Sequence, residues 1–372
     1  MTKLVKKLKI LVAPLDWGLG HTMRCVPVIN ELLKNNVEVI LAGNEVQRTI
    51  FQSEFPECLI LDLFGYNIKY SKKKHQLPFK ILWQTPRILS TIKKENKWLT
   101  SIIKLHKIDG VISDNRYGLY NASVPSYFIT HQLGIKTNMG YLADRMVQKL
   151  NYNRINQFDH CWIPDYEGAK NLGGDLSHPE KLPITPCTYL NTLSRFEPEQ
   201  SVNEKNNLLF VISGPEPQRT IFEKKVLTQL EGYEEKATII RGLPAGQKSL
   251  GVAKNIKVYN HLTKDKMKEE FRKASFVICR SGYSSVMDIN NLKVKSIMVP
   301  TPGQTEQEYL GKYLMKVGFS VCCSQSSFIL SEVLKKATSF SYHGFVPYQP
   351  KNLSRAIKKF IQDCESRTST TL

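Results

Sequence analysis

Residues 276–319, FVICRSGYSSVMDINNLKVKSIMVPTPGQTEQEYLGKYLMKVGF, carry the pattern that decides the fold. A short apolar run at 276–279 ends at a glycine turn, and a helical stretch follows. A second apolar run at 296–299 breaks at a loop of prolines and glycine, and another helix starts near Thr305. This order of elements is typical of a parallel sheet that binds its ligand beyond the carboxyl ends of its strands.

The same stretch predicts a nucleotide site. The starts of its two helices would direct backbone N–H groups into the crevice, where they suit a diphosphate. Asp288 lies in the second turn of the first helix, and its carboxylate could accept hydrogen bonds from a ribose.

Several positions of this stretch form an ordered motif: Cys279, Arg280, Ser281, Gly282, Asp288, Val299, Pro300, Gln307 and Tyr309. The motif resembles the C-terminal nucleotide-sugar half of the MurG-like, family 28 glycosyltransferases. The resemblance implies a GT-B fold, in which two Rossmann-like α/β domains with doubly wound parallel sheets face a cleft. It also implies that Asp288 binds the ribose, where the family more often has Glu. Gln307 would touch the donor sugar and diphosphate. Glu308 stands where the family has a second glutamine and is also a donor-binding candidate, where an acid would either read a different sugar hydroxyl or repel phosphate.

The first half of the chain begins with another strand–loop–helix pattern. An apolar strand at 10–13 leads into a loop with Gly18 and Gly20, and an amphipathic helix follows. A second strand at 37–41 completes a βαβ unit, the usual start of a doubly wound sheet. The loop lacks a third glycine and the second strand lacks a terminal acid, which argues against NAD or FAD.

His21 follows this loop at a helix N-terminus, where the helix dipole disfavours the charged imidazole. A neutral imidazole could take a proton from an acceptor hydroxyl or donate to a phosphate. In the MurG-like family a glycine-rich loop ending in Gly-His occupies this place. Gly20 and His21 match it, so the resemblance implies that Gly18 and Gly20 contact the donor. Asp16 either orients His21 or is a second candidate base.

Polar residues also follow the strands predicted at 111–112 and 124–130. Asp114 is either a functional residue at a strand end or a cap for a following helix. His131 either lines the cleft or is structural. The strand at 161–164 is expected to be the last of this half.

The second half offers further donor-binding candidates. Gly214 lies in a turn after the strand at 208–212, and Arg219 could supply a cation for the diphosphate. His261 lies where proteins of this kind read the base through backbone groups. Arg280 either binds phosphate or holds carbonyl groups under the glycine turn, and the second interpretation is preferred. Ser281 and Gly282 form that turn.

The predicted organisation has four parts. An acceptor-side domain covers 1–190, and a polar linker covers 191–207. The nucleotide-sugar domain covers 208–350. Residues 351–372 form a helix that returns to the first domain and a short tail.

Composition supports an ordinary globular protein. The 372 residues suffice for two domains, and 41% hydrophobic with 23% charged residues is typical of globular chains. Eight cysteines without a CxxC pair indicate reduced thiols in a cytoplasmic protein rather than disulfides or zinc. No apolar run reaches the eighteen or so residues of a membrane span. A cytoplasmic location is expected, either soluble or peripheral at the inner face of the cell membrane.

The formal net charge of +19 is the main anomaly of the composition. Eleven Lys or Arg residues and one acid, Glu95, lie in 69–107, interleaved with large apolar residues. This mixture fits either an anionic membrane surface or a solvated lysine face over core residues. Nucleic acid is not expected as a partner, because no recognised binding motif accompanies the charge.

The leading hypothesis is an inverting glycosyltransferase with a nucleotide-sugar donor, UDP-linked by preference, and a glycan or lipid-linked acceptor. His21 is the preferred base, ahead of Asp16 and Asp114. Helix N-termini with Arg280, Arg219 or Gln307 would stabilise the leaving diphosphate. The sequence contains no D-x-D, which fits catalysis without a metal, and no cofactor is expected. The alternatives are a UDP-sugar hydrolase or epimerase of the same fold, and a non-catalytic nucleotide-sugar-binding or membrane-associated scaffold.

Overall fold

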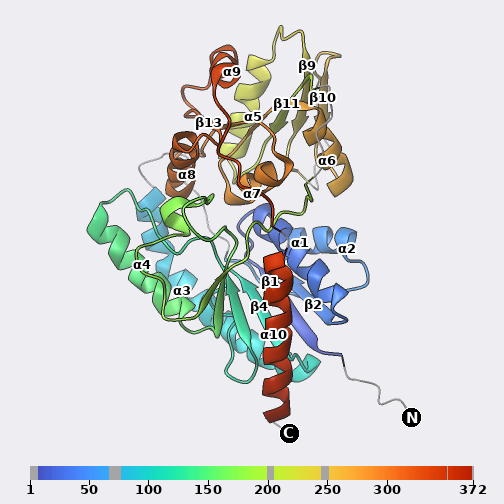
Figure 1. Ribbon diagram of the computed structural model, residues 1–372, viewed down its shortest axis with the longest axis vertical. Coiled ribbons are helices and arrows are strands. Elements are labelled where there is room, and N and C mark those ends of the chain that lie inside the picture. The colour runs from blue at the N-terminus through green and yellow to red at the C-terminus, as the bar shows by residue number, and fades with distance from the viewer. Residues whose placement is uncertain (1–6, 67–76, 199–204, 244–250, 350, 371–372) are drawn as a thin grey trace. The chain divides into compact units, whose positions relative to one another are not determined.

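A computed structural model describes residues 7–66, 77–198, 205–243, 251–349 and 351–370. The chain divides into two compact units. Unit 1 ends at Leu193 and resumes at Gln349, and Ser194–Tyr348 form unit 2. Each unit is an α/β domain built on its own parallel sheet, which confirms the predicted fold class (Figure 1).

In the described part of unit 1, seven parallel strands form one sheet in the order β3-β2-β1-β4-β5-β6-β7. The strands are β1 (Lys9–Pro14), β2 (Glu38–Gly43), β3 (Leu59–Asp62), β4 (Gly110–Asp114), β5 (Ser126–Ile129), β6 (His160–Ile163) and β7 (Cys187–Tyr189). The central strands β1 and β4 are almost entirely buried, because helices cover both faces of the sheet.

β7 corrects the expectation that 161–164 is the last strand of this half. It pairs in parallel with β6, with Cys187 opposite Cys161. β7 has only three residues, all half-buried, so it lacks the apolar run that marks the other strands in the sequence.

Helices from both ends of the chain pack on this sheet (Figure 1). They are α1 (Leu19–Lys34), α2 (Glu45–Glu54), α3 (Leu77–His106), α4 (Tyr141–Ile155), the short 3-10 turn η2 (Gly174–Leu176) and α10 (Lys351–Thr370). α1 buries Cys25, Val28 and Ile29 at helical spacing. α2 begins with a capping box in which Asn44 and Gln47 bind each other's backbone N–H.

α10 belongs to unit 1 and packs on its sheet. The Phe360 ring lies 4.8 Å from the Tyr127 ring and 5.9 Å from the Trp162 ring. A Cβ atom at Gly110 would lie 2.5 Å from the Cys364 Sγ atom, so the glycine allows the helix to approach β4. The helix continues to Thr370 and takes in most of the expected tail.

The described part of 69–107 favours the core interpretation of its apolar residues. Ile92 and Leu99 are buried, and Leu99 belongs to the cluster that includes Leu11 and Val111. Lys93, Lys94 and Lys97 are exposed on the other side of α3. Residues 67–76 and the side chains of 77–85 lie outside the described residues.

In the described part of unit 2, six parallel strands form a sheet in the order β10-β9-β8-β11-β12-β13. The strands are β8 (Asn207–Val211), β9 (Lys236–Ile240), β10 (Ile256–Tyr259), β11 (Ala274–Cys279), β12 (Ser296–Met298) and β13 (Val321–Cys322). The helices are α5 (Gln218–Gln229), α6 (Lys264–Lys273), α7 (Tyr283–Leu292), α8 (Thr305–Lys316) and α9 (Leu330–Ser339). The order of strands reverses between β8 and β11, which is where sheets of this kind bind ligands.

The segment expected to be a polar linker, 191–207, is packed where the structure describes it. Leu193 and Phe196 are both buried, and the Phe196 ring lies 5.7 Å from the Phe271 ring. Asn291 Nδ2 donates to the Phe196 carbonyl at 3.1 Å. The boundary between the two units falls inside this segment, after Leu193, and its two large apolar side chains are buried rather than exposed.

Candidate active site

In unit 1 a candidate site forms where β1 and β4 end side by side. Pro14 pairs with Asp114 in the register of these parallel strands, so the Asp114 side chain lies at the carboxyl end of the sheet. The chain then turns at Gly18, whose φ of 75° suits glycine, and α1 begins at Leu19. His21 and Arg24 are three residues apart on α1, so both side chains can reach Asp114.

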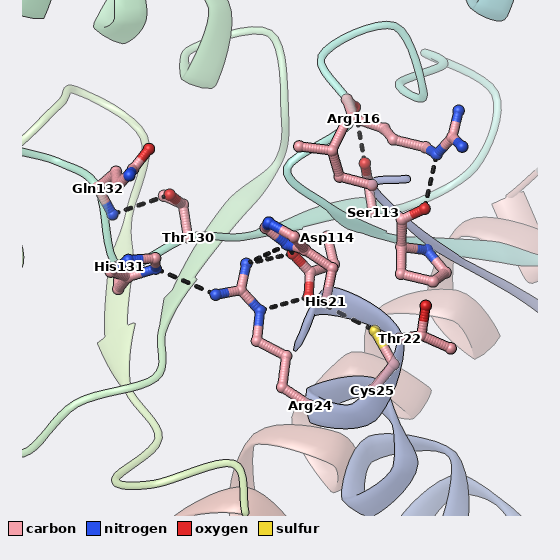
Figure 2. A network of polar contacts seen from close by, with 12 residues as sticks. His21, Thr22, Arg24, Cys25, Ser113, Asp114, Arg116, Thr130, His131 and Gln132 are labelled. Atoms are coloured by element: carbon pink, nitrogen blue, oxygen red, sulfur yellow. Dashed lines mark hydrogen bonds and ion pairs between the residues drawn. The ribbon is translucent and has the colours of Figure 1, made fainter. Parts of the chain in front are cut away.

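Figure 2 shows the resulting network of polar contacts. His21 Nδ1 lies 2.9 Å from Asp114 Oδ1, and the Arg24 guanidinium donates to both carboxylate oxygens of Asp114. Arg24 Nη1 donates to His131 Nδ1 at 3.0 Å, and Arg24 Nη2 lies 3.0 Å from His21 Nδ1. One buried arginine therefore links the ends of β4 and β5 to α1.

Burial and charge set the protonation of this network. Burial and the neighbouring Arg24 charge lower the pKa of His21 below its ordinary value of 6.5. Burial would raise the pKa of Asp114, but Arg24 and His21 hold it well below the usual range. At neutral pH the network therefore contains a neutral His21 beside an ionised Asp114.

The hydrogen bonds bear on the tautomers of the two rings. A guanidinium only donates, so His131 Nδ1 is an acceptor and its proton lies on Nε2. His21 Nδ1 lies near both Asp114 Oδ1, which only accepts, and Arg24 Nη2, which only donates, so these contacts fit either tautomer of His21. In the tautomer that donates to Asp114, the Nε2 lone pair of His21 is left to act as a base, and the side chain is 15% exposed.

Asp16 does not join this network. Its Oδ1 atom accepts a hydrogen bond from Tyr66 N at 3.1 Å. A Cβ atom at Gly65 would lie 2.1 Å from Asp16 Oδ2, so the carboxylate packs closely on this loop. His21 contacts Asp114 instead.

Arg24 was not among the residues singled out in the sequence. A signal was present, because Arg24 lies one helical turn after His21, among apolar residues of α1 that face the sheet. An arginine on the buried face of a helix needs an acid, and Asp114 at a strand end is the partner it finds.

A separate group of residues, called here the unit 2 cluster, forms in unit 2, where the neighbouring strands β8, β11 and β12 end. Gly214, with a φ of 106°, follows β8, and a Cβ atom there would lie 3.5 Å from Thr301 Oγ1 in the loop after β12. Gly282 starts α7 after β11, and a Cβ atom there would lie 4.0 Å from Gln307 Nε2. The two glycines thus leave room beside a hydroxyl and an amide.

Thr301 and Gln307 are held in place at this position. Gln307 Oε1 accepts from Thr301 N at 2.9 Å, which leaves its Nε2 group as a donor. The Ser281 hydroxyl donates to the Gln307 carbonyl at 2.8 Å and ties the glycine turn to α8. Thr301 Oγ1 is buried and has no hydrogen-bond partner among the described residues.

Asp288 is half-buried on α7 and contacts the segment that enters unit 2. The Ser194 hydroxyl donates to Asp288 Oδ1 at 2.6 Å. Burial raises the pKa of Asp288 to about 6, against the opposing effects of Arg195 and Ser194. The same Arg195 charge, together with burial, lowers the pKa of His261. Asp288 and His261 therefore both lie near Arg195.

Arg219 and Arg280 are engaged inside unit 2. Arg219 pairs with Glu216 at 2.5 Å and with Glu223, so its charge is compensated internally. Arg280 donates to the carbonyls of Val299, Pro300 and Gln218 and to Gln325 Oε1, and its guanidinium lies 4.3 Å from the Phe222 ring. Arg280 therefore bonds carbonyl groups of the loop after β12 and of α5.

Glu308 also has a structural contact. Its Oε1 atom accepts from Gly303 N at 3.1 Å. The carboxylate thus accepts from an amide of the loop before α8.

Two kinds of feature are absent from the segments that the structure describes. These segments contain no helix with both the length and the apolar character to cross a bilayer. Across the same segments, no group of three or more His, Cys, Asp or Glu side chains is arranged to hold a metal ion.

Known proteins resemble the chain in sequence. Residues 209–363, which include the whole unit 2 cluster, match the glycosyltransferase family 28 C-terminal domain. The chain is 26% identical over 345 residues to an uncharacterised glycosyltransferase of Methanosarcina acetivorans, with 86% of each chain covered. It is 21% identical over 348 residues to the UDP-N-acetylglucosamine–N-acetylmuramyl-(pentapeptide) pyrophosphoryl-undecaprenol N-acetylglucosamine transferase of a Thermoanaerobacter species, covering 85% of this chain and 86% of that protein.

Solved structures share the fold. MurG of Acinetobacter baumannii matches with a TM-score of 0.56 at 14% identity, covering 96% of this chain and 100% of that one. The spinosyn rhamnosyltransferase SpnG matches with a TM-score of 0.61 at 13% identity, covering 97% of each chain. The fold and the family domain define a glycosyltransferase of the GT-B class. Within that class, residues 209–363 carry the family 28 C-terminal domain and the chain is similar to MurG-like enzymes, as the motif around Asp288 predicted.

Proposed function

We propose that the protein is an inverting hexosyltransferase that moves a sugar from a UDP-linked donor to a hydroxyl acceptor without a metal ion. The observation that carries this proposal is the pair formed by His21 and Asp114 at the carboxyl end of the first sheet. A neutral histidine oriented by a carboxylate is the arrangement that removes a proton from a hydroxyl group.

In the proposed step, His21 Nε2 takes the proton of the acceptor hydroxyl. The acceptor oxygen then forms a bond to the anomeric carbon of the donor sugar, and the bond from that carbon to the diphosphate oxygen breaks. The diphosphate leaves with the electron pair, and a single displacement inverts the anomeric centre. Asp114 stabilises the imidazolium that forms, because it stays ionised beside Arg24.

For the leaving diphosphate, we propose neutral donors rather than arginine side chains. The Thr301 hydroxyl and Gln307 Nε2 lie beside the space that Gly214 and Gly282 leave open. A buried hydroxyl without a partner supports this assignment, because such a group gains most from a ligand. Asp288 remains the proposed ribose ligand.

The proposed acceptor is a lipid-linked glycan reached by a peripheral protein at the cytoplasmic face of the membrane. The support is the Thermoanaerobacter relative, whose name specifies an undecaprenol-linked acceptor. A soluble glycan is the alternative acceptor.

The donor class can be tested by calorimetry with UDP, GDP, CMP, ADP and dTDP in the presence of EDTA. We expect UDP to bind and Asp288→Ala to weaken the binding. If none of these nucleotides binds, the proposal is wrong.

A hydrolase is the competing function, because His21 and Asp114 could equally activate a water molecule. Incubation with a UDP-sugar alone distinguishes the two. A transferase releases UDP slowly until a glycan acceptor is added, whereas a hydrolase needs no acceptor. A non-catalytic binder would hold UDP and release nothing under either condition.

A further inference from the structure

The edge strand β7 places one cysteine directly opposite another. Cys187 on β7 pairs with Cys161 on β6 in the register of these parallel strands. Neighbouring strands of a sheet lie about 4.7–4.9 Å apart. Disulfides usually join residues whose Cα atoms are about 4.4–6.8 Å apart, so the backbone spacing at this pair suits a disulfide.

Both thiols also lie on the same face of the sheet. Cys161 belongs to a buried cluster with Phe128 and Phe158, and Cys187 packs against this cluster. The next residues along the two strands confirm the alternation. His160 and Thr188 contact each other from Nε2 to Oγ1 at 2.8 Å, and they lie on the opposite face.

The two thiols differ in their access to solvent. Cys161 is buried, whereas Cys187 is half-buried on the last strand of the sheet. The Cys187 thiol donates to the Thr185 carbonyl at 3.3 Å. A small polar molecule from solvent therefore reaches Cys187 before it reaches Cys161.

The contact between the thiols makes Cys187 the more acidic one. A hydrogen bond from Cys161 lowers the pKa of Cys187, against the opposing effect of burial. The same hydrogen bond and burial raise the pKa of Cys161. All eight cysteines lie in the described segments, and Cys187 is the one whose pKa is lowered. An accessible thiol of low pKa beside a second cysteine is the arrangement that reacts with oxidants.

We propose that Cys161 and Cys187 form a redox-active dithiol, which hydrogen peroxide converts into a disulfide between β6 and β7. The Cys187 thiolate attacks one peroxide oxygen, the O–O bond breaks, and the leaving hydroxide takes up the proton that Cys187 has lost. The Cys161 sulfur then attacks the Cys187 sulfenic acid, and its hydroxyl leaves with the Cys161 proton as water. Two thiols and one peroxide thus give one disulfide and two water molecules. This chemistry does not depend on the proposed transfer reaction.

The disulfide would fasten the outermost strand at the point where the chain leaves unit 1. Directly after β7, Leu190 N donates to the Ile163 carbonyl at 2.8 Å and Asn191 N donates to the Asp165 carbonyl at 3.0 Å. The chain passes into unit 2 after Leu193. The amide hydrogen of Leu190 should therefore exchange more slowly in the oxidised protein than in the reduced one.

The test is treatment of the folded full chain with hydrogen peroxide, followed by unfolding, alkylation of the remaining thiols and peptide mapping by mass spectrometry without reductant. Wild type is expected to lose two of its eight reactive thiols and to yield one pair of peptides joined through Cys161 and Cys187. Dithiothreitol should restore both thiols. Cys161→Ala should stop at a sulfenic acid on Cys187, which dimedone traps.

The matched control is Cys58→Ala, which removes another half-buried cysteine, one whose pKa burial raises. This control should form the same disulfide at the wild-type rate. The wild-type peptide map is decisive by itself, so the test does not depend on the folding of either variant.

Three results in wild type would overturn the proposal. Cys187 could be oxidised to a sulfinic acid without a bond to Cys161, it could stay reduced after Cys58 has reacted, or it could join only a second copy of the chain. An unchanged exchange rate at Leu190 in the oxidised protein would show that the disulfide does not fasten β7.

Discussion

Asp114 and Arg24 have opposite effects on His21 at the scale of single residues. Asp114 favours the charged imidazole, and Arg24 together with burial disfavours it. The lowered pKa of His21 means that a base at this position stays active well into mildly acidic solution.

The first prediction concerns His21 as the base. His21→Ala should lower kcat by about 10²–10⁴-fold, because general base catalysis contributes this much. The Kd of the donor nucleotide, measured by calorimetry, should stay at the wild-type value. A His21→Ala enzyme with wild-type turnover would rule out His21.

The second prediction concerns the pH profile. For wild type, kcat/KM should fall only below pH 6.5, since the neutral form of His21 is active and its pKa lies below this value. Arg24→Gln removes a charge that lowers this pKa, so the acidic limb should move to higher pH. If the acidic limb does not move in the variant, this limb does not report the titration of His21. Circular dichroism controls for folding, because the variant leaves Asp114 buried without its arginine.

The third prediction concerns Asp288, whose pKa burial raises to about 6. Below this pH the carboxylate is protonated and no longer a strong acceptor for ribose hydroxyls. The Kd for UDP should therefore rise by about tenfold between pH 7 and pH 5. Asp288→Asn should bind UDP more weakly at pH 7. Any pH dependence of the Kd that remains in Asp288→Asn comes from the titration of the UDP phosphate, which also occurs near pH 6.

The same shift in pKa affects stability. Because the folded pKa lies above the ordinary value of 3.8, ionisation of Asp288 favours unfolding, and stability is lost as the pH rises from about 4 through 6. Asp288→Asn should therefore raise the free energy of unfolding at pH 7, by at most about 3 kcal/mol. Chemical denaturation at pH 4 and pH 7 measures the difference.

The sequence revealed individual site residues unevenly. Asp288 was found because its motif has several parts in fixed order, and His21 because it ends a glycine loop. Arg219 was assigned to the diphosphate, although Glu216 and Glu223 at i−3 and i+4 already predict internal pairing. The contact of Asp16 with the Tyr66 amide had no signal, because fifty residues separate the two.

At the scale of elements, two glycines near the donor-side loops should behave differently. Gly282 starts α7, and its nearest neighbour lies 4.0 Å from an added Cβ, so Gly282→Ala should leave Tm unchanged. It should weaken UDP binding if the diphosphate approaches this turn.

Gly311 on α8 is the matched control. A Cβ atom there would lie 2.5 Å from Cys322 Sγ and 3.0 Å from Pro300 Cγ. Gly311→Ala should therefore lower the free energy of unfolding by about 1–3 kcal/mol, as overpacking does. Thermal denaturation of both variants detects overpacking, and calorimetry detects the loss of UDP binding. Equal UDP affinity for Gly282→Ala and wild type would show that Gly282 is not part of the site.

Elements with a strong periodic pattern were predictable, and those that depend on distant partners were not. The apolar runs of β1 and β11 specify buried parallel strands by themselves. β7 forms a strand because it pairs with the edge of β6. Residues 191–198 pack because Phe196 contacts the Phe271 ring and accepts a hydrogen bond from Asn291. Such tertiary contacts override local preference.

At the scale of the whole molecule, unit 2 is an insertion between two parts of unit 1. The chain leaves unit 1 after Leu193 and returns at Gln349. Asn191 Nδ2 donates to the Gln349 carbonyl at 2.8 Å, so the exit and the return are adjacent.

The last prediction follows from this connectivity. A fragment of residues 194–348 should fold alone and bind UDP, because it has its own sheet and core cluster. Cooperative thermal unfolding and calorimetry test this. A fragment that does not unfold cooperatively would mean that unit 2 needs unit 1.

The position of α10 has a consequence for synthesis on the ribosome. Phe360 covers Tyr127 and Trp162, yet it is made only after the whole of unit 2. Translation proceeds at about 5–20 residues per second, so the apolar surface beneath α10 stays uncovered for roughly 8–30 s while unit 2 is synthesised. During this time unit 1 is expected to bind chaperones, and premature termination in unit 2 would release a chain prone to aggregate.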